Sequence, residues 1–230
     1  MNSKMTKNDW VKCSENAAGF CNVLASKIEN AIKRKRNFEA AAAYAGYQAS
    51  IPPFTGIFKS IPAGQKNTLK AKGEDIIAKF LSDKKYDMNT CVDVIEQIRA
   101  LYKNGGVKGY TYGNAQKWVN MSFKYYVIFN AIDFNTKKVD LKTAFSKIPR
   151  FNNYELFAVD SIMINAIQQK LGINFNYKWS KCDNIQAFID YWNGVKAKLA
   201  GQQIDMPFIW ELNNWKSNGN KQKPKSIYYA

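Results

Sequence analysis

Histidine is absent from the 230 residues of this chain. Its absence excludes Ser-His-Asp and Cys-His nucleophiles, hydrolases that bind zinc through histidine, and nucleases that depend on an imidazole. Any catalysis by this protein must therefore use lysine, aspartate, glutamate, tyrosine or cysteine side chains.

Cysteine and long apolar runs are scarce as well. The four cysteines, Cys13, Cys21, Cys91 and Cys182, never lie at C-x-x-C spacing, so we expect neither a metal site nor a disulfide scaffold. The first nine residues are polar, and no run approaches the roughly 18 apolar residues that a membrane span needs. The sequence predicts a reduced, cytoplasmic protein with no membrane contact, and no motif in it indicates a cofactor.

Acidic residues are also few, 18 against 34 lysines and arginines, which gives a formal net charge of +16. Basic residues cluster at 33–36, 66–72, 137–138 and 221–225. Such clusters favour binding to the phosphates of nucleic acid, and they make double-stranded DNA the expected partner. Solubility, or a bias of the source proteome, would explain the same charge.

Helical periodicity dominates the chain, whose composition of 46% hydrophobic and 23% charged residues is typical of a globular domain. Apolar residues at three- and four-residue steps predict helices at 9–36, 38–47, 74–81, 89–102, 115–129, 141–147, 153–171, 184–199 and 207–215. We expect a loop at 55–72, a strand-like stretch at 173–179 and a mobile basic tail at 217–230. The predicted fold class is all-α, a single domain over residues 1–230 with two helical lobes around a cleft.

A glycine-rich turn separates two of the predicted helices. Residues 103–109 read Lys-Asn-Gly-Gly-Val-Lys-Gly, and a further Gly-Asn pair precedes the next helix. The backbone amides of such a helix-hairpin-helix unit can hold a phosphate, because glycine lets the chain approach a ligand closely. The candidate DNA-binding residues are Gly105, Gly106, Lys108, Gly109, Gly113 and Asn114. The alternative is that these glycines serve only to turn the chain.

Two ionisable residues stand out near this unit. Lys117 falls in the first turn of the helix predicted from residue 115, where the helix dipole disfavours a cation and favours a neutral, nucleophilic amine. Asp160 lies inside the apolar run 156–164, and a buried carboxylate is costly unless it is paired or functional. The alternative for Asp160 is a capping role for a helix that begins at Ser161, and capping is compatible with catalysis.

This arrangement resembles the helix-hairpin-helix DNA glycosylases, including the 8-oxoguanine-type and archaeal branches. The resemblance covers residues 89–170 and rests on the glycine-rich hairpin, the lysine-bearing helix and the apolar-flanked Val159-Asp160. It implies that hairpin amides hold a DNA phosphate, that Lys117 attacks C1′ of a flipped nucleotide, and that Asp160 activates the lysine and stabilises the oxocarbenium-like transition state. Lys108 is a second candidate for the family lysine.

Aromatic residues offer faces on which an extruded base could stack. The candidate base pocket consists of Trp118, Trp179, Phe208 and Trp210, and packing in the core is the alternative for each tryptophan. We therefore predict a monomeric DNA glycosylase that excises a damaged or modified base and leaves an abasic site, with AP-lyase activity left open. The resemblance suggests oxidised purines, whereas excision of modified bases from phage DNA would make the protein a defence factor. The alternatives are a non-catalytic nucleic-acid-binding protein and an interaction module for an acidic protein.

Overall fold

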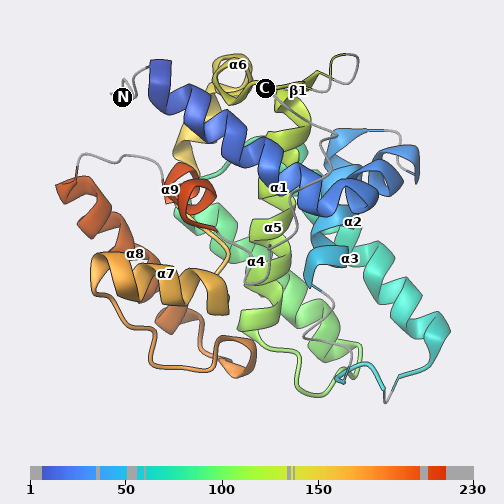
Figure 1. Cartoon of the computed structure of the whole chain (residues 1–230). Coiled ribbons are helices and arrows are strands. Elements are labelled where there is room, and N and C mark those ends of the chain that lie inside the picture. The colour runs from blue at the N-terminus through green and yellow to red at the C-terminus, as the bar shows by residue number, and fades with distance from the viewer. Residues whose placement is uncertain are drawn as a thin grey trace.

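The computed structural model describes residues 7–34, 37–50, 56–59, 61–133, 136, 138–202 and 207–215, without the side chains of residues 7, 20–31 and 34. Within these residues the fold is all-α, as predicted (Figure 1). The basic residues at 35–36, 137 and 221–225, together with the tail predicted at 217–230, lie outside the described residues.

Helices make up most of the described residues. They are α1 (Lys7–Arg34), α2 (Phe38–Ser50), α3 (Ala63–Asp83), α4 (Met88–Asn104), α5 (Tyr112–Ala131), α6 (Leu141–Lys147), α7 (Ser161–Leu171), α8 (Ile185–Gly201) and α9 (Pro207–Asn214), with 3-10 turns η2 (Pro149–Asn153) and η3 (Trp179–Lys181). Strands β1 (Ile132–Asp133) and β2 (Lys138–Val139) pair antiparallel, with Ile132 opposite Val139.

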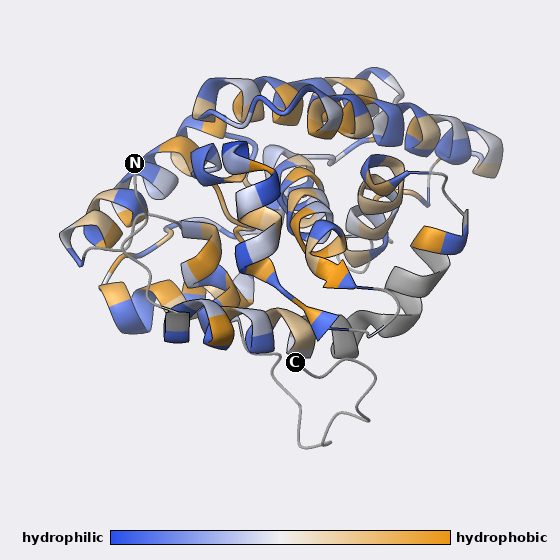
Figure 2. Cartoon of the chain, turned by 90° about the horizontal axis from the view of Figure 1, so that it is seen from above, coloured by the Kyte–Doolittle hydropathy of each residue, from blue (hydrophilic) through white to orange (hydrophobic). Residues whose placement is uncertain are grey.

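Helix α5 forms the centre of the molecule, and nearly all of its residues are buried (Figure 1). Its most extensive contact is with α2. Gly46 of α2 lies so close to α5 that a Cβ there would be 2.1 Å from the Ser122 Oγ. Hydrophobic residues alternate with hydrophilic ones along the outer helices (Figure 2), as amphipathic helices around a shared core require.

Helices α7, α8 and α9 contact one another and lie to one side of α5 (Figure 1). Helix α1 crosses in front of α5 and contacts α2, α6 and α9. This grouping is compatible with two lobes, and the cleft between them stays a prediction.

The loop predicted at 55–72 is wrong in its second half, because α3 already begins at Ala63. Pro62 stands at the N-cap with φ −58°. A helix leaves its first N–H groups unpaired in any case, so proline at its entrance costs no hydrogen bond. Pro62 and Gly64 therefore mark the start of a helix rather than its interruption.

The helix predicted at 153–171 is too long. Residues 154–159 run between η2 and α7 without helical structure, and α7 begins only at Ser161, after its N-cap. The predicted end is confirmed, since Gly172 follows α7 with φ 71°. Residues 173–179 form no strand; Phe175 instead packs its ring 5.1 Å from that of Phe188 on α8.

Candidate functional site

The connection between α4 and α5 uses its first three amides to end α4. The N–H groups of Gly105, Gly106 and Val107 donate to carbonyls of residues 101, 103 and 102. Gly106 and Gly109 have φ of 75° and 83°, which other residues rarely adopt. The amides of Gly105 and Gly106 are thus engaged within the protein in this conformation, and the phosphate contact of the hairpin stays a prediction.

The amides of the next two residues predicted to contact phosphate also donate to groups within the protein. The Gly113 N–H donates to the Cys182 carbonyl at 3.1 Å, and the Asn114 N–H donates to the Thr111 Oγ1 at 3.3 Å. Both Gly113 and Asn114 are buried. Of the predicted hairpin contacts, Gly106, Lys108 and Gly109 are exposed.

Lys117 and Asp160 meet although they are far apart in the sequence. The Lys117 Nζ lies 3.2 Å from the Asp160 Oδ2, and the two side chains are only 13% and 9% exposed. Helix α5 begins at Tyr112 rather than near residue 115, so Lys117 is the sixth residue of the helix. The predicted position in the first turn is therefore wrong, and the partner of Lys117 is a carboxylate rather than the helix dipole alone.

Asp160 uses different oxygens for different contacts. Its Oδ1 accepts hydrogen bonds from the N–H groups of Ile162 at 3.0 Å and Met163 at 3.1 Å, which confirms the predicted N-cap of α7. Its Oδ2 faces Lys117. The cap fixes the carboxylate, and the fixed carboxylate in turn orients the amine.

Trp179 is a second partner of the lysine. The Lys117 Nζ lies 4.9 Å from the centroid of the Trp179 ring, a cation–π distance. The backbone of η3 rests directly on the start of α5, where a Cβ on Gly113 would lie 1.7 Å from the Trp179 carbonyl oxygen. The Thr111 Oγ1 also donates to the Ser180 carbonyl at 3.2 Å.

The extended segment 154–160 is held along α5 by polar side chains. Gln116 donates to the Val159 carbonyl at 2.7 Å and accepts from the Val159 N–H at 3.0 Å. One turn further along α5, Asn120 accepts a hydrogen bond from the Tyr154 hydroxyl. These contacts set the register of the segment and thereby place Asp160 opposite Lys117.

A second buried ion pair lies behind the first, and the sequence did not identify it. The Lys124 Nζ is 2.5 Å from the Glu211 Oε1, with both side chains at most 2% exposed. Burial raises the pKa of Glu211, the charge of nearby Asp160 raises it further, and Lys124 opposes both effects. Lys124 follows Lys117 by seven residues, a spacing that places both on one face of α5. That spacing was the available signal.

Three of the four predicted base-pocket residues belong to the core. Trp118 is 1% exposed, and its Nε1 donates to the Ala43 carbonyl at 2.9 Å. Phe208 and Trp210 are 2% and 7% exposed, on the short helix α9. Tertiary packing within the described part of the chain buries all three side chains. Trp179 alone of the four is partly exposed and touches the Lys117 site.

Comparison with known proteins assigns no family, since the chain matches no protein-family model, no curated protein and no solved structure. In the described ranges, Cys, Asp and Glu nowhere gather in a group of three that could hold a metal ion. The same ranges contain no helix with the length and apolar character to traverse a bilayer. The site is thus defined by its own geometry, a lysine and a carboxylate in contact beneath an indole.

Proposed function

We propose that the protein is a DNA glycosylase in which Lys117 and Asp160 act on the sugar of a flipped nucleotide. The observation that supports this most strongly is the 3.2 Å contact between the Lys117 Nζ and the Asp160 Oδ2 in a site with little solvent. The helix-hairpin-helix resemblance assigns its nucleophile and its carboxylate to these two residues. A pair that far apart in sequence meets only if the fold brings the two segments together.

The chemistry of such a pair is balanced without a metal or a cofactor. A proton passes from the Lys117 ammonium to the Asp160 carboxylate, and the lone pair freed on the lysine nitrogen forms a bond to C1′ while the glycosidic C–N bond breaks. The departing base carries the bonding electrons and takes the proton from Asp160. The C1′–O4′ bond of the sugar then breaks, O4′ takes a proton from the lysine nitrogen, and the resulting protonated imine is reduced by borohydride to a stable covalent complex.

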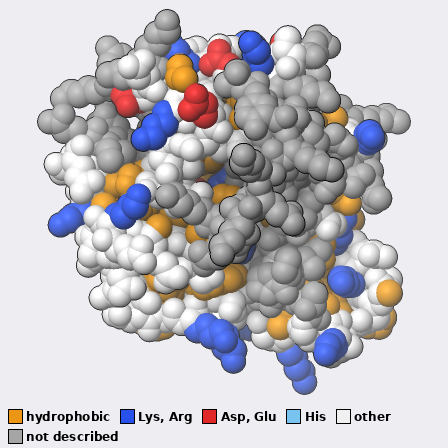
Figure 3. All heavy atoms as spheres, in the orientation of Figure 1, with side chains coloured by type: hydrophobic (Ala, Val, Ile, Leu, Met, Phe, Trp, Pro, Cys, Tyr) orange, Lys and Arg blue, Asp and Glu red, His pale blue; other side chains and the backbone are white. Residues whose placement is uncertain are grey.

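The charge on the surface of the molecule suits a polyanion. On the face shown in Figure 3, the visible Asp and Glu side chains lie in the upper part, and the lower half shows Lys and Arg. Exposed lysines flank the site in the chain, Lys103 and Lys108 before α5 and Lys178 and Lys181 around η3. As proposed, the enzyme is a cytoplasmic monomer that acts on double-stranded DNA.

Borohydride trapping tests the proposal. The full-length protein is incubated with labelled duplexes that each carry one modified base, oxidised purines and enzymatically modified pyrimidines included, and excision is revealed by alkali. We expect excision of at least one base and a trapped complex that Lys117→Gln abolishes, with DNA affinity within a few-fold of the parent protein.

A lysine–carboxylate contact at a more exposed position provides the matched control. Lys196 pairs with Glu155 at a more exposed position, so Lys196→Gln removes the same charge and should leave trapping intact. Trapping that persists in Lys117→Gln would exclude Lys117 as the nucleophile. Salt-dependent binding without excision on the whole panel would instead favour a non-catalytic nucleic-acid-binding protein, and no DNA binding at all would favour a module for an acidic protein.

A further inference from the structure

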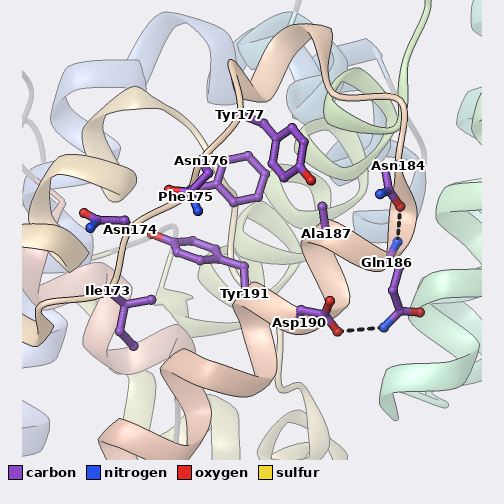
Figure 4. Close-up of a pocket in the computed structure, with 10 residues that line it drawn as sticks. All are labelled: Ile173, Asn174, Phe175, Asn176, Tyr177, Asn184, Gln186, Ala187, Asp190 and Tyr191. Carbon is purple, nitrogen blue, oxygen red and sulfur yellow. Dashed lines mark hydrogen bonds between the residues drawn. The ribbon is translucent and has the colours of Figure 1, made fainter.

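A pocket opens between the segment that follows α7 and the first half of α8 (Figure 4). Its volume is about 280 Å³, close to the lower end of the roughly 300–1,000 Å³ typical of small-molecule sites. The size suits a ligand group with one ring system. Neither Lys117 nor Asp160 lines this pocket.

One wall of the pocket is aromatic. The ring of Phe175 lies 5.6 Å from that of Tyr177 and 5.0 Å from that of Tyr191. Tyr177 is 52% exposed, and among the described residues Val11 is the other exposed large hydrophobic side chain. A large ring held by a half-buried neighbour and left open to solvent is a surface on which a planar group can stack.

Much of the rest of the rim is polar, and part of it is held by hydrogen bonds. The Asn184 Oδ1 accepts the Gln186 N–H at 3.0 Å, and the Gln186 Nε2 donates to the Asp190 Oδ1 at 2.7 Å (Figure 4). The exposed amides of Asn174 and Asn176 lie on the opposite side (Figure 4). Stacking on an aromatic ring together with hydrogen bonds to amide and carboxylate groups is how proteins recognise unpaired bases.

The segment is anchored and lies beside positive charge. Asp183, which ends it, is bound by the Arg99 guanidinium through two hydrogen bonds of 2.6 Å and 2.5 Å. Exposed Lys178 directly follows Tyr177, and exposed Lys181 lies three residues further on. Two peptide units separate Tyr177 from Trp179, so their Cα atoms are at most about 7 Å apart. One DNA strand can therefore reach the pocket and the Lys117 site together.

We propose that this pocket binds an unpaired nucleobase of a DNA strand. Tyr177 stacks on the base, the amides and Asp190 contact its edge, and Lys178 and Lys181 contact the flanking phosphates. The inference shares with the proposed function the assumption that DNA is the ligand, but it does not require excision.

Binding to two matched single strands tests the pocket. The probes are a labelled strand of about ten thymidines, within the site sizes of single-strand binders, and the same backbone without bases. At equal salt, fluorescence anisotropy should show the full-length protein binding the thymidine strand about tenfold more tightly, the order that stacking of one base supplies. Tyr177→Ala should remove this preference, and Tyr177→Phe should retain it.

Controls separate the pocket from the rest of the surface. Val11 is 48% exposed and lies on α1, so Val11→Ala should leave the preference unchanged, as should Lys117→Gln. Equal affinity of the parent protein for the two strands, or a preference that survives in Tyr177→Ala, would overturn the proposal. Loss of the preference in Lys117→Gln would place the base at the other site and overturn it too.

The outcomes also distinguish the two proposals. If the protein excises nothing but Tyr177→Ala removes its preference for the thymidine strand, the result supports base binding in the pocket and contradicts the glycosylase. If Lys117→Gln abolishes excision while Tyr177→Ala leaves the base preference unchanged, the result supports the glycosylase and contradicts base binding in the pocket.

Discussion

At Asp160, helix capping and contact with Lys117 can be separated by experiment because different oxygens serve them. In Asp160→Asn, Oδ1 still accepts the two N–H groups of α7, while the charge that faces Lys117 is lost. In Asp160→Ala both contacts disappear. Comparison of the two substitutions thus separates the contribution of Oδ1 to stability from the contribution of Oδ2 to activity.

We expect Asp160→Asn to abolish the trapped complex and to lower the rate of excision by orders of magnitude. Its loss in unfolding free energy should be on the order of 1–2 kcal/mol, because a partly buried charge loses its partner. Asp160→Ala should be less stable again by about 1 kcal/mol, the usual value of an N-cap. Thermal unfolding and the trapping assay measure the two effects. Full activity in Asp160→Asn would reduce Asp160 to a cap.

Asp183 gives the protein a defined pH dependence of stability. The hydrogen bonds from Arg99 lower the pKa of Asp183 below its usual value of 3.8. A carboxyl whose pKa is lower in the folded state stabilises the protein above its unfolded pKa and loses that contribution as the pH falls through the folded value.

We therefore expect Asp183→Asn to be less stable than the parent protein at pH 7 and the difference to shrink below about pH 4. The Asp183 side chain is 44% exposed, so solvent screening limits the difference at pH 7 to about 1 kcal/mol. Denaturant unfolding of both proteins from pH 7 to pH 3 checks this. A difference that stays constant over that range would show that the ion pair contributes nothing to stability.

At the scale of elements, the contact between η3 and the start of α5 holds Trp179 on Lys117. We expect Gly113→Ala to displace η3, because the new Cβ would lie 1.7 Å from the Trp179 carbonyl oxygen. Such overpacking costs roughly 1–3 kcal/mol. The yield of trapped complex should fall together with the stability of this variant, because the Trp179 ring moves away from the Lys117 amine.

Gly194→Ala is the matched control. A Cβ at Gly194 meets nothing within 4 Å, and this glycine lies inside α8, where alanine favours the helix. Thermal unfolding of the two variants should therefore shift in opposite directions. Unchanged stability in Gly113→Ala would mean that η3 is not docked on α5.

The sequence predicted the helices well where periodicity and caps agree. It predicted α6 over 141–147 and the end of α7 before Gly172, and both are confirmed. It missed the start of α3, because proline and glycine mark helix entrances as well as loops. It joined 154–159 to α7, because burial against α5 produces an apolar run in an extended segment just as it does in a helix.

The candidate site was predictable only in part. Lys117 and Asp160 stood out as charges in unusual local settings, and the structure brings them together. The role of Gly113 was not predictable, because the carbonyl that excludes a side chain there belongs to Trp179, which is distant in sequence. The burial of Trp118 and Phe208 likewise depends on tertiary contacts. An aromatic residue in the sequence indicates a core position and a pocket position equally well.

At the scale of the whole molecule, the proposed association with DNA would be governed by the net charge of +16. If binding rests on phosphate contacts, the logarithm of the association constant falls linearly with the logarithm of salt, by about 0.9 for each phosphate neutralised. A steep slope is thus expected between about 50 and 200 mM salt, and a flat response would contradict nucleic-acid binding altogether.

Lys108 and Lys117 should differ in this measurement. Lys108 is exposed in the α4–α5 connection, so Lys108→Gln should weaken duplex binding and lower the salt slope by about one, as the loss of one phosphate contact requires. Lys117 is engaged by Asp160, so Lys117→Gln should leave the slope unchanged. Lys79→Gln controls for net charge, because Lys79 is 76% exposed and pairs with Asp83 at the end of α3. A slope that falls equally in Lys79→Gln and Lys108→Gln would mean that DNA responds to total charge and that the α4–α5 connection makes no contact of its own.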